Sequence, residues 1–483
     1  MMSQEDLINY IYAKQREIKT LSKNKLEWKN KTFNHRIEYY RIKDHVDSFL
    51  EGDYYNRFII MPGLRGVGKT TIIFQLYEYL TNVKAIDNSN ILYLDINDLR
   101  SHFKTDLLMV IESFLANVHQ TTLVDLNKKI FLFIDEAHLD ENWANYGKLI
   151  FDKTDNIFMI FTGSSALDLE VNADATRRIK KEIIFPCNFR EYLLLKHDLS
   201  INSGDLIDLI LKGDGESVNK AVKAEIEIRK TLNNLNNNPN IEFEKFLLSY
   251  GFPFALILNE RDNYKKITDI ISKIITTDIP SLKNFNNMTN VNISRIITYL
   301  ALEKPGETSN IKLANILSIS PKSVNDILNV LEKTQLVFSI KPYGTGGKIL
   351  KKAWQYFFLS PSIKAAINFQ IGRYDVNHKK CLASLAETLV ISSIFKLNVI
   401  SNKSLGLFYD PNKKGVDFLI KDLDNVIPIE VGVGKKTKSQ LNIAMNNYDS
   451  DYGILVSNRT SSIALRDNII YIPLLTYACI WLF

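Results

Sequence analysis

Cysteine is scarce in this 483-residue chain, which has three, Cys187, Cys381 and Cys479, far apart from one another. Three scattered thiols form neither the paired spacing of a metal site nor a disulfide framework. This scarcity excludes a small secreted fold held together by disulfides and predicts a protein of a reducing compartment.

Long hydrophobic runs are also missing. No uninterrupted apolar stretch reaches the roughly 18 residues that a membrane span requires. The first twenty residues, MMSQEDLINYIYAKQREIKT, carry early acids and no apolar core, which is unlike a secretory signal. The 46% hydrophobic and 24% charged content is typical of a globular protein. We therefore expect a cytoplasmic protein with no membrane partner, built from about two to four domains.

The charge of the chain is concentrated in one segment. Between residues 290 and 370, nine lysines and one arginine face four acids, so this segment carries a net charge equal to the +6 of the whole chain. A basic patch confined to one segment favours a polyanionic partner. A solvated lysine-rich face is the alternative interpretation.

Glycines are few, but three of them lie in the stretch RFIIMPGLRGVGKTTIIFQLYEYL, residues 57–80. Residues 63–70 match G-x-x-x-x-G-K-[ST] at every fixed position, between an apolar run and a helical pattern. Such a loop surrounds phosphates with backbone N–H groups, its lysine reaches the β- and γ-phosphates, and its hydroxyl holds Mg²⁺. The predicted nucleotide-binding residues are Gly63, Leu64, Arg65, Gly66, Val67, Gly68, Lys69, Thr70 and Thr71.

A second buried strand with acids at its end follows in the stretch KIFLFIDE, residues 129–136. Ligands bind at the carboxyl ends of strands in open α/β sheets, and a phosphate loop needs a carboxylate to orient its magnesium. We therefore expect Thr70 and Asp135 to hold Mg²⁺, while Lys69 and Glu136 serve catalysis, with Glu136 orienting or deprotonating the attacking water.

Two further strands complete the predicted sheet. Residues 157–161, IFMIF, run into Thr162, Gly163 and Ser164, and residues 90–95 form another apolar run ending in an acid. A polar side chain at the end of such a strand can contact the γ-phosphate or the attacking water. Thr162 is the predicted sensor, with Ser164 as its rival. Alternating strands and helices of this kind indicate a doubly wound sheet.

These pieces resemble a prokaryotic family of AAA-type P-loop ATPases, often called archaeal-type ATPases. The matching stretches extend from residue 63 to residue 280 and read GLRGVGKTT, FLFIDEAH, FTGSSALDL, RRIKKEIIFPCNFREYL, YGFPFAL and TTDIP. The resemblance extends over most of residues 50–483. It implies an ATPase core joined to a winged helix and a C-terminal nuclease-like fold.

The resemblance also nominates an arginine. In such ATPases an arginine lies a few residues before a Pro-x-x-Phe-x-Glu segment, which here is residues 186–191, and Arg178 occupies that place. This implies a γ-phosphate or subunit-interface arginine, and the second role would require a homo-oligomer. Arg177 stands where relatives often have glycine. A solvated basic turn, formed with Lys180 and Lys181, is the alternative.

The basic segment has the pattern of a winged helix-turn-helix. Two short helices are expected over residues 296–302 and 311–317, and a third begins at Pro321 with Ser320 as its N-cap. Residues 337–340 and 353–359 bracket a glycine-rich turn and predict a hairpin. We expect double-stranded DNA to bind through residues 310–352. The contacting residues would be Lys322, Ser323, Asn325, Lys348, Lys351 and Lys352. A winged helix used only for packing is the alternative.

The last segment has the shape of a nuclease without its lysine. Glu387, Asp417 and Glu430 occur in the order that metal-dependent restriction-type nucleases of the PD-(D/E)XK kind use. Their lysine position is Gly432 here, and Lys435 and Lys436 lie beyond a turn. We therefore predict a degenerate domain that binds without cleaving, with residual metal-dependent cleavage as the alternative.

Together these signals predict an α/β fold, in which a doubly wound P-loop ATPase core with a parallel sheet is followed by a helical lid, a winged helix-turn-helix and a small α/β nuclease-like domain. The predicted boundaries are 1–45 for an N-terminal helical segment, 46–190, 191–289, 290–372 and 373–483 for these parts in turn. We predict an ATPase that uses ATP and Mg²⁺ as a DNA-associated switch or motor. A protein-binding signalling or scaffolding ATPase and an ATP-gated nuclease are the alternatives.

Overall fold

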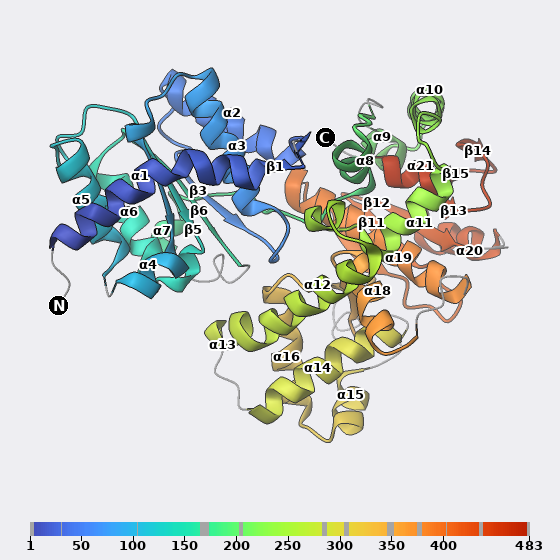
Figure 1. Cartoon of the computed structure of the whole chain (residues 1–483). Coiled ribbons are helices and arrows are strands. Elements are labelled where there is room, and N and C mark those ends of the chain that lie inside the picture. Colours follow the sequence, from blue (N-terminus) through green and yellow to red (C-terminus); the bar gives the residue numbers. More distant parts are fainter. Residues whose placement is uncertain are drawn as a thin grey trace. The chain divides into compact units, whose positions relative to one another are not determined.

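A computed structural model describes the chain over residues 4–29, 31–103, 105–164, 173–201, 206–282, 287–303, 309–344, 352–373, 379–401, 403–433 and 438–480. The chain divides into two compact units, Met1–Phe185 and Pro186–Phe483 (Figure 1). Each unit has a sheet of its own and is described by itself.

The first unit is a five-stranded parallel sheet covered by helices. The strand order is β4-β5-β6-β3-β7, and every pairing is parallel. The strands are β3 (Phe58–Pro62), β4 (Ile91–Asp95), β5 (Ile130–Asp135), β6 (Ile157–Gly163) and β7 (Lys180–Lys181). The α-helices are α1 (Gln4–Leu26), α2 (Ile37–Glu51), α3 (Lys69–Glu78), α4 (Ile96–His102), α5 (Leu107–Val118), α6 (Trp143–Lys153) and α7 (Ala173–Thr176). A short pairing of β1 (Glu27–Trp28) with β2 (Lys31–Thr32) follows α1.

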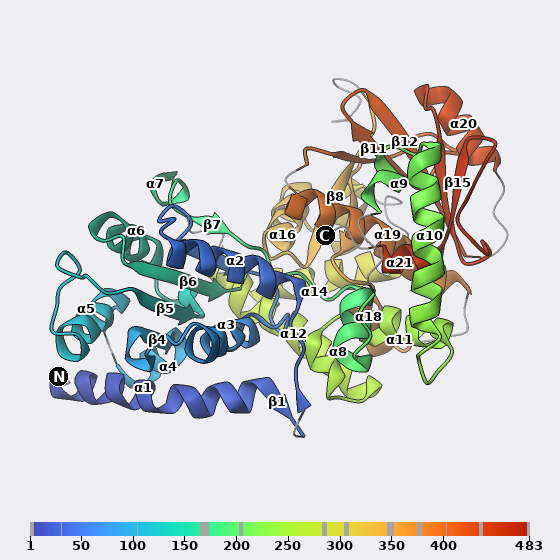
Figure 2. The ribbon, with the colours of Figure 1, turned by 90° about the horizontal axis from the view of Figure 1, so that it is seen from above.

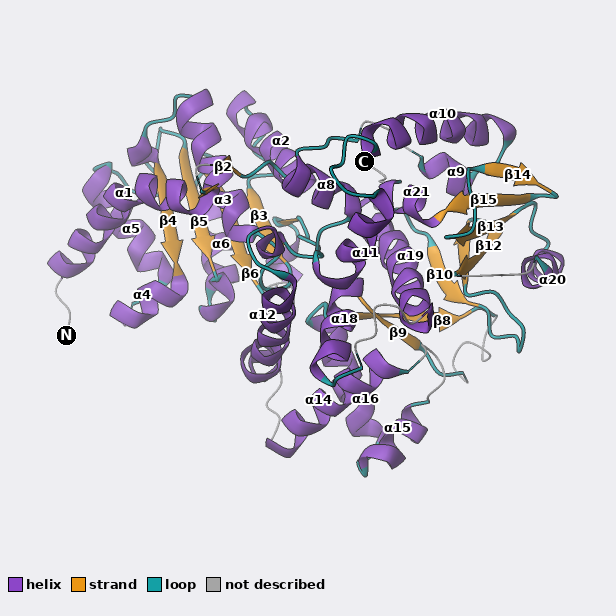
Figure 3. Ribbon diagram, turned by 45° about the vertical axis from the view of Figure 1, so that its right-hand side comes forward, coloured by secondary structure: helices purple, strands orange, loops and turns teal. Residues whose placement is uncertain are grey.

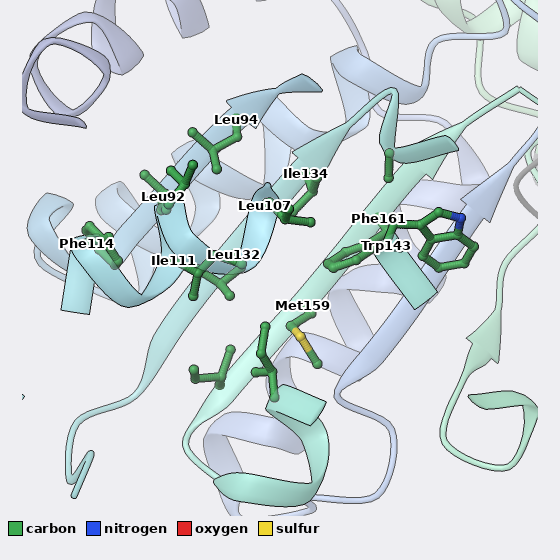
Figure 4. Close-up of a cluster of buried hydrophobic side chains, with 14 of the residues drawn as sticks. Leu92, Leu94, Leu107, Ile111, Phe114, Leu132, Ile134, Trp143, Met159 and Phe161 are labelled. Atoms are coloured by element: carbon green, nitrogen blue, oxygen red, sulfur yellow. The ribbon is translucent and has the colours of Figure 1, made fainter. Parts of the chain in front are cut away.

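The central strands are apolar throughout because helices cover both faces of the sheet. Every residue of β3, β5 and β6 is buried. Leu132 and Met159 belong to a core cluster that includes Phe114 of α5 and Trp143 of α6 (Figure 4). Phe131, one residue out of step, contacts Phe49 of α2. Alternate side chains therefore enter opposite layers, which confirms the predicted doubly wound core.

The N-terminal helix α1 protects the edge of this sheet. It packs along β4, α3 and α5 (Figure 2). The side chain of Gln15 donates a hydrogen bond of 2.6 Å to the carbonyl of Ile91 in β4, and Asn88 donates one of 2.9 Å to the carbonyl of Gln15. An uncovered edge strand would present unpaired backbone groups to other chains. Helix α1 therefore satisfies part of the edge that β4 exposes.

The second unit contains a mixed sheet of eight strands, in the order β14-β15-β13-β12-β11-β10-β8-β9 (Figure 3). The strands are β8 (Val337–Pro342), β9 (Gln355–Phe358), β10 (Gly406–Tyr409), β11 (Phe418–Asp422), β12 (Asn425–Gly432), β13 (Gly453–Ser457), β14 (Ala464–Arg466) and β15 (Ile469–Pro473). The helices that precede it are α8 (Phe189–His197), α9 (Ile207–Leu211), α10 (Gly215–Leu232), α11 (Pro239–Ser249), α12 (Glu260–Lys273) and α13 (Ile279–Leu282). This sheet and its helices form the α/β region expected after the core.

In the described part of the basic segment, three helices come first and two antiparallel strands follow them, as the sequence predicts. The helices are α14 (Asn287–Leu302), α15 (Asn310–Leu317) and α16 (Pro321–Lys333), and β8 pairs with β9 in antiparallel fashion. The Ser320 side chain accepts the backbone N–H of Ser323 and caps α16. The order of elements is that of a winged helix, and its assignment as a DNA-binding module stays a prediction.

The hairpin is also part of the larger sheet. Strand β8 pairs in parallel with β10, so hydrogen bonding continues across the boundary predicted at residue 372. Helices α18 (Pro361–Gln370) and α19 (Lys379–Ser401) follow the hairpin. Helices α20 (Ser439–Tyr448) and α21 (Leu474–Cys479) come later along the chain. The division of this unit into lid, winged helix and nuclease-like domain stays a prediction.

Within the described ranges, one helix has the length and mean hydropathy of a membrane span, namely Cys381–Ser401 within α19. It contains Glu387 and Lys396, so the apolar run is interrupted as the sequence indicates. Of its most apolar window, 56% is buried inside the structure. A mostly buried core helix passes the same test, and the finding is weak evidence for a membrane.

Candidate nucleotide-binding site

The phosphate loop connects β3 to α3 at the carboxyl edge of the first sheet. Gly66 and Gly68 have φ values of 81° and 96°, in the left-handed region that favours glycine. A Cβ on Gly63 would lie 2.4 Å from the carbonyl oxygen of Ile184. Each of the three glycines in the motif is therefore required by the local path of the chain.

Lys69 and Thr70 begin helix α3 directly after the loop. The Lys69 ammonium is buried and donates hydrogen bonds of 2.8 Å and 3.1 Å to the carbonyls of Gly63 and Leu64. The loop thus wraps around its own lysine. A helix N-terminus of this kind adds a positive potential that favours phosphate.

Asp135 is the centre of the polar network at this edge. Its carboxylate accepts hydrogen bonds from Thr70 at 2.6 Å and from Tyr93 at 3.3 Å, and also from Thr162. The residues come from four elements, α3, β4, β5 and β6. Strand β6 lies between β3 and β5 in the sheet, which places Thr162 between the loop and the acids.

The oxygens of Thr70 and Asp135 form a donor set that fits magnesium. Mg²⁺ is usually held by one or two protein oxygens together with substrate phosphates and water. Over the described residues, no group of three or more His, Cys, Asp or Glu is placed to hold a metal ion. The pair therefore suits a metal that arrives with a nucleotide.

Of the two predicted sensor candidates, Thr162 lies against the acid. Its hydroxyl donates to Asp135, and its side chain is fully buried. Ser164 is also buried, and its hydroxyl has no hydrogen-bond partner among the residues that the structure describes. Thr162 thus contacts the predicted magnesium ligand, whereas the hydroxyl of Ser164 makes no hydrogen bond to it within the described part of the chain.

Glu136 follows Asp135 in an unusual backbone conformation. Its φ and ψ are 53° and 36°, in the left-handed region that non-glycine residues rarely adopt. Such strain persists only where the surroundings enforce it, and it clusters at functional sites. Its carboxylate faces Arg65 of the loop and His138 of the following turn.

Burial and neighbouring acids shift the ionisation of two groups near Asp135. Burial first, and then the charge of Asp135, raises the pKa of Tyr93 far above its ordinary value. The same two causes raise the pKa of Asp95, which lies beside Asp135 in the register of β4 and β5. Tyr93 therefore stays a neutral hydroxyl donor to the Asp135 carboxylate.

Arg178 lies away from the loop of its own chain. Strand β7 pairs in parallel with β3 so that Lys180 is level with Ile59, and Arg178, in the turn before β7, lines the same hollow as Arg57 at the amino end of β3. The loop begins at Gly63, beyond the carboxyl end of β3 and six residues after Arg57, or about 20 Å along a strand. Arg178 pairs with Asp152 at 2.5 Å, in a hollow of about 510 Å³ that Tyr54, Tyr55 and Arg177 also line.

Sequence reasoning missed Arg36, which hydrogen-bonds to the backbone of the phosphate loop. Its guanidinium is buried and donates to the carbonyl of Val67 at 2.6 Å and to that of Phe185 at 3.0 Å. It also pairs with the buried carboxylate of Glu38 at 3.2 Å. Val67 and Phe185 lie far from Arg36 along the sequence, and neither spacing nor periodicity marks the residue. Sequence reasoning also missed His138 and Tyr93, and the partner of Tyr93, Asp135, lies 42 residues away.

Removing Arg36 should destabilise the protein. The Arg36→Ala variant removes the guanidinium that pairs with the buried Glu38 carboxylate, and breaking a buried ion pair in this way costs about 3–5 kcal/mol. We expect the melting temperature of the affected transition to fall by about 8 °C or more. Thermal unfolding followed by calorimetry measures this. Adding a second change, Glu38→Gln, should recover part of the lost stability because it removes the buried negative charge. A fall of less than about 2 °C in Arg36→Ala would contradict the role assigned to the pair.

Two of the predicted nuclease acids, Asp417 and Glu430, lie close together. The Asp417 carboxylate accepts the backbone N–H of Val431 at 2.8 Å, and the Glu430 carboxylate accepts that of Asp417 at 3.2 Å. Glu430 is fully buried. Glu387 lies on α19, which packs against β12, the strand that carries Glu430. Lys435 and Lys436 lie outside the described residues, and the prediction of a binding domain without cleavage stays a prediction.

The predicted DNA-contacting residues are partly visible. Lys322 and Asn325 are exposed on α16, whereas Ser323 is half-buried and its hydroxyl lies 2.8 Å from that of Ser320. Lys352 donates to the carbonyl of Pro411 at 2.6 Å. Lys348 and Lys351 lie outside the described residues.

Comparison with known proteins finds two family models and several relatives. Residues 55–193 match an AAA domain, and residues 240–372 match a domain of unknown function. The uncharacterized protein MJ1637 of Methanocaldococcus jannaschii is 32% identical over 442 residues, 91% of this chain and 88% of that protein. An uncharacterized protein of Haemophilus influenzae is 22% identical over 77% of this chain and 81% of its own length.

Solved structures resemble the chain only loosely. The Walker-type ATPase PABY2304 of Pyrococcus abyssi is 13% identical and covers 71% of this chain and 97% of its own, with a TM-score of 0.42. The ORC1 protein of Aeropyrum pernix, solved in complex with DNA, is 10% identical and covers 72% of this chain and 96% of its own, with a TM-score of 0.30. TM-scores this low carry no weight for function. The identity to MJ1637 and its coverage show that the chain belongs to the family of that protein, and residues 55–193 of the chain match an AAA domain.

Proposed function

We propose that this protein binds and hydrolyses ATP with Mg²⁺ at the carboxyl edge of its first sheet. The observation that carries the proposal is the hydrogen bond between Thr70 and Asp135, which joins the phosphate loop to the acid-bearing strand. The two would hold Mg²⁺, which would neutralise charge on the phosphates.

The chain's own residues supply the rest of the proposed reaction. The loop amides and Lys69 bind phosphate oxygens. Glu136 orients the attacking water and accepts its proton. Thr162, held on the Asp135 carboxylate, contacts the γ-phosphate or that water. The strained backbone of Glu136 supports this role because it fixes the carboxylate beside the loop.

Arg178 supports a reaction shared between subunits. Because it lies at the amino end of β3, it does not reach the phosphate loop of its own chain. Its place at a hollow with two exposed tyrosines suits contact with another copy of the chain. We therefore propose a homo-oligomer in which Arg178 acts on the nucleotide of a neighbour, as an arginine finger does when supplied in trans.

Double-stranded DNA is the proposed polyanionic partner of the basic segment. On α16 the residues Lys322, Asn325 and Asn329 are exposed at three- and four-residue steps, on the face opposite the buried Val324 and Ile327. Lysine contacts phosphate or guanine, and asparagine can bind adenine through two hydrogen bonds. A single polar face on a helix of this kind suits a groove.

Binding to duplex DNA should therefore weaken with salt. We expect the affinity for a duplex of random sequence to fall at least tenfold between 50 and 200 mM salt. The double variant Lys322→Ala/Asn325→Ala should bind several-fold more weakly. The exposed Lys223 of α10 provides the matched control, and Lys223→Ala should bind as the natural chain does. Fluorescence anisotropy measures all three. A DNA affinity that does not change with salt, or an equal loss of DNA affinity in the double variant and in Lys223→Ala, would instead support the alternative of a protein-binding ATPase.

A further inference from the structure

The Glu136 carboxylate lies between two side chains that the proposed reaction does not use. Its Oε2 atom is 3.6 Å from Nη1 of Arg65 and 3.6 Å from Nε2 of His138. Arg65 is the third residue of the phosphate loop, and His138 lies two residues beyond Glu136 in the turn of Ala137–Leu139. Oε2 of Glu136 therefore lies close to one side chain from the phosphate loop and one from the turn after β5.

His138 contributes no positive charge to this arrangement. Its ring is buried, and over the described residues neither ring nitrogen has a hydrogen-bond partner. Burial first, and then the charges of Arg65 and Lys69, lowers the pKa of His138 to about 3. The imidazole of His138 is therefore neutral and adds no charge next to the Glu136 carboxylate. The guanidinium of Arg65 brings a full positive charge to the same oxygen.

A carboxylate at this position creates an electrostatic problem for ATP. In a loop of this type Lys69 reaches the terminal phosphates, while Thr70 and Asp135 would hold the Mg²⁺ bound to them. Glu136 follows Asp135 directly. A negative carboxylate repels a negative phosphate, and the repulsion is strongest for the phosphate nearest to it. ADP lacks the third phosphate and feels this repulsion less.

We propose that Arg65 is a positioning residue that balances the charge of Glu136, so that the site binds a nucleoside triphosphate in preference to a diphosphate. The inference rests on the proposed function of the loop. Arg65 both fixes the carboxylate and cancels its repulsion of the third phosphate. The loop and the water-orienting acid are thereby coupled, and selection between ATP and ADP is built into a single ion pair.

A double-mutant cycle on nucleotide affinity tests this coupling. Isothermal titration calorimetry on the full chain with Mg²⁺ gives the dissociation constants for ADP and for a triphosphate analogue that is not hydrolysed. The proteins are the natural chain, Arg65→Ala, Arg65→Lys, Glu136→Gln and the double variant Arg65→Ala/Glu136→Gln. The cycle isolates the Arg65–Glu136 interaction because each single change removes one partner.

We expect Arg65→Ala to weaken the triphosphate analogue about tenfold and ADP less than about threefold. In the Glu136→Gln background the same change should cost less than about threefold for either nucleotide, because no carboxylate then needs balancing. Arg65→Lys keeps the charge and should recover most of the analogue affinity. Recovery by this variant also shows that the loop still folds.

Two other results have distinct meanings. Equal losses for both nucleotides, or an undiminished loss in the Glu136→Gln background, would show that Arg65 binds phosphate directly and would overturn the inference while leaving the proposed function intact. A natural chain that binds neither nucleotide would overturn the proposed function and this inference with it.

Discussion

The Glu136→Gln variant is expected to turn over ATP about a thousandfold more slowly than the natural chain while it still binds ATP. The amide has nearly the shape of the carboxylate but cannot accept a proton from water. It also carries no charge to repel the third phosphate, so binding should be retained or tightened. Steady-state phosphate release gives the rate, and calorimetry gives the affinity.

Lys69→Ala provides the contrasting variant. This variant lacks the buried Lys69 ammonium, which in the natural chain donates hydrogen bonds to two loop carbonyls. We expect it to lose both ATP binding and ATP turnover. A neighbouring change, Thr71→Ser, keeps a small hydroxyl on α3 and should leave turnover within about twofold of the natural chain. If Glu136→Gln retained more than about a tenth of the natural rate, the water-orienting role would have to pass to another residue.

The Arg178→Ala variant is expected to lose about a thousandfold in turnover, the magnitude typical of an arginine finger. Because Arg178 lies at the edge of the sheet opposite the loop, the loss should leave ATP binding by the same chain unchanged. Arg177→Ala is the matched control, since it removes a similar charge from the same hollow. It should lower turnover by less than about threefold.

Mixing two inactive variants tests whether Arg178 acts between chains. An Arg178→Ala subunit has an intact loop, and a Lys69→Ala subunit has an intact Arg178. Combined in one oligomer, the two restore complete sites at some interfaces, and turnover should rise well above that of either variant alone. No recovery at any mixing ratio would show that Arg178 serves its own chain or only the fold.

The parts of the site that could be predicted from sequence are those written in short, local patterns. The glycine spacing of residues 63–70 follows from a tight turn, and the buried run ending in Asp135 follows from parallel-sheet burial. The structure brings Thr70, Asp135 and Thr162 together because parallel strands end at one edge. The doubly wound core was predictable for the same reason.

The parts that could not be predicted depend on contacts between distant segments. Arg36 reaches the carbonyls of Val67 and Phe185, and nothing in its own neighbourhood signals this. The distance of Arg178 from its own loop depends on the register of β7 against β3. The parallel pairing of β8 with β10 joins segments that the pattern assigns to separate domains. Pairing register is decided by tertiary packing, which a single sequence does not display.

The central claim is that the phosphate loop and the strand ending in Asp135 form a working ATPase. Mg²⁺-dependent ATP turnover of the full natural chain, measured with and without duplex DNA and beside Lys69→Ala, tests it most directly. The account predicts turnover that requires Mg²⁺, rises with DNA and is absent from Lys69→Ala. Turnover that is indifferent to DNA would remove the proposed partner and keep the ATPase. Turnover that persists in Lys69→Ala, or none in the natural chain under any of these conditions, would contradict the claim itself.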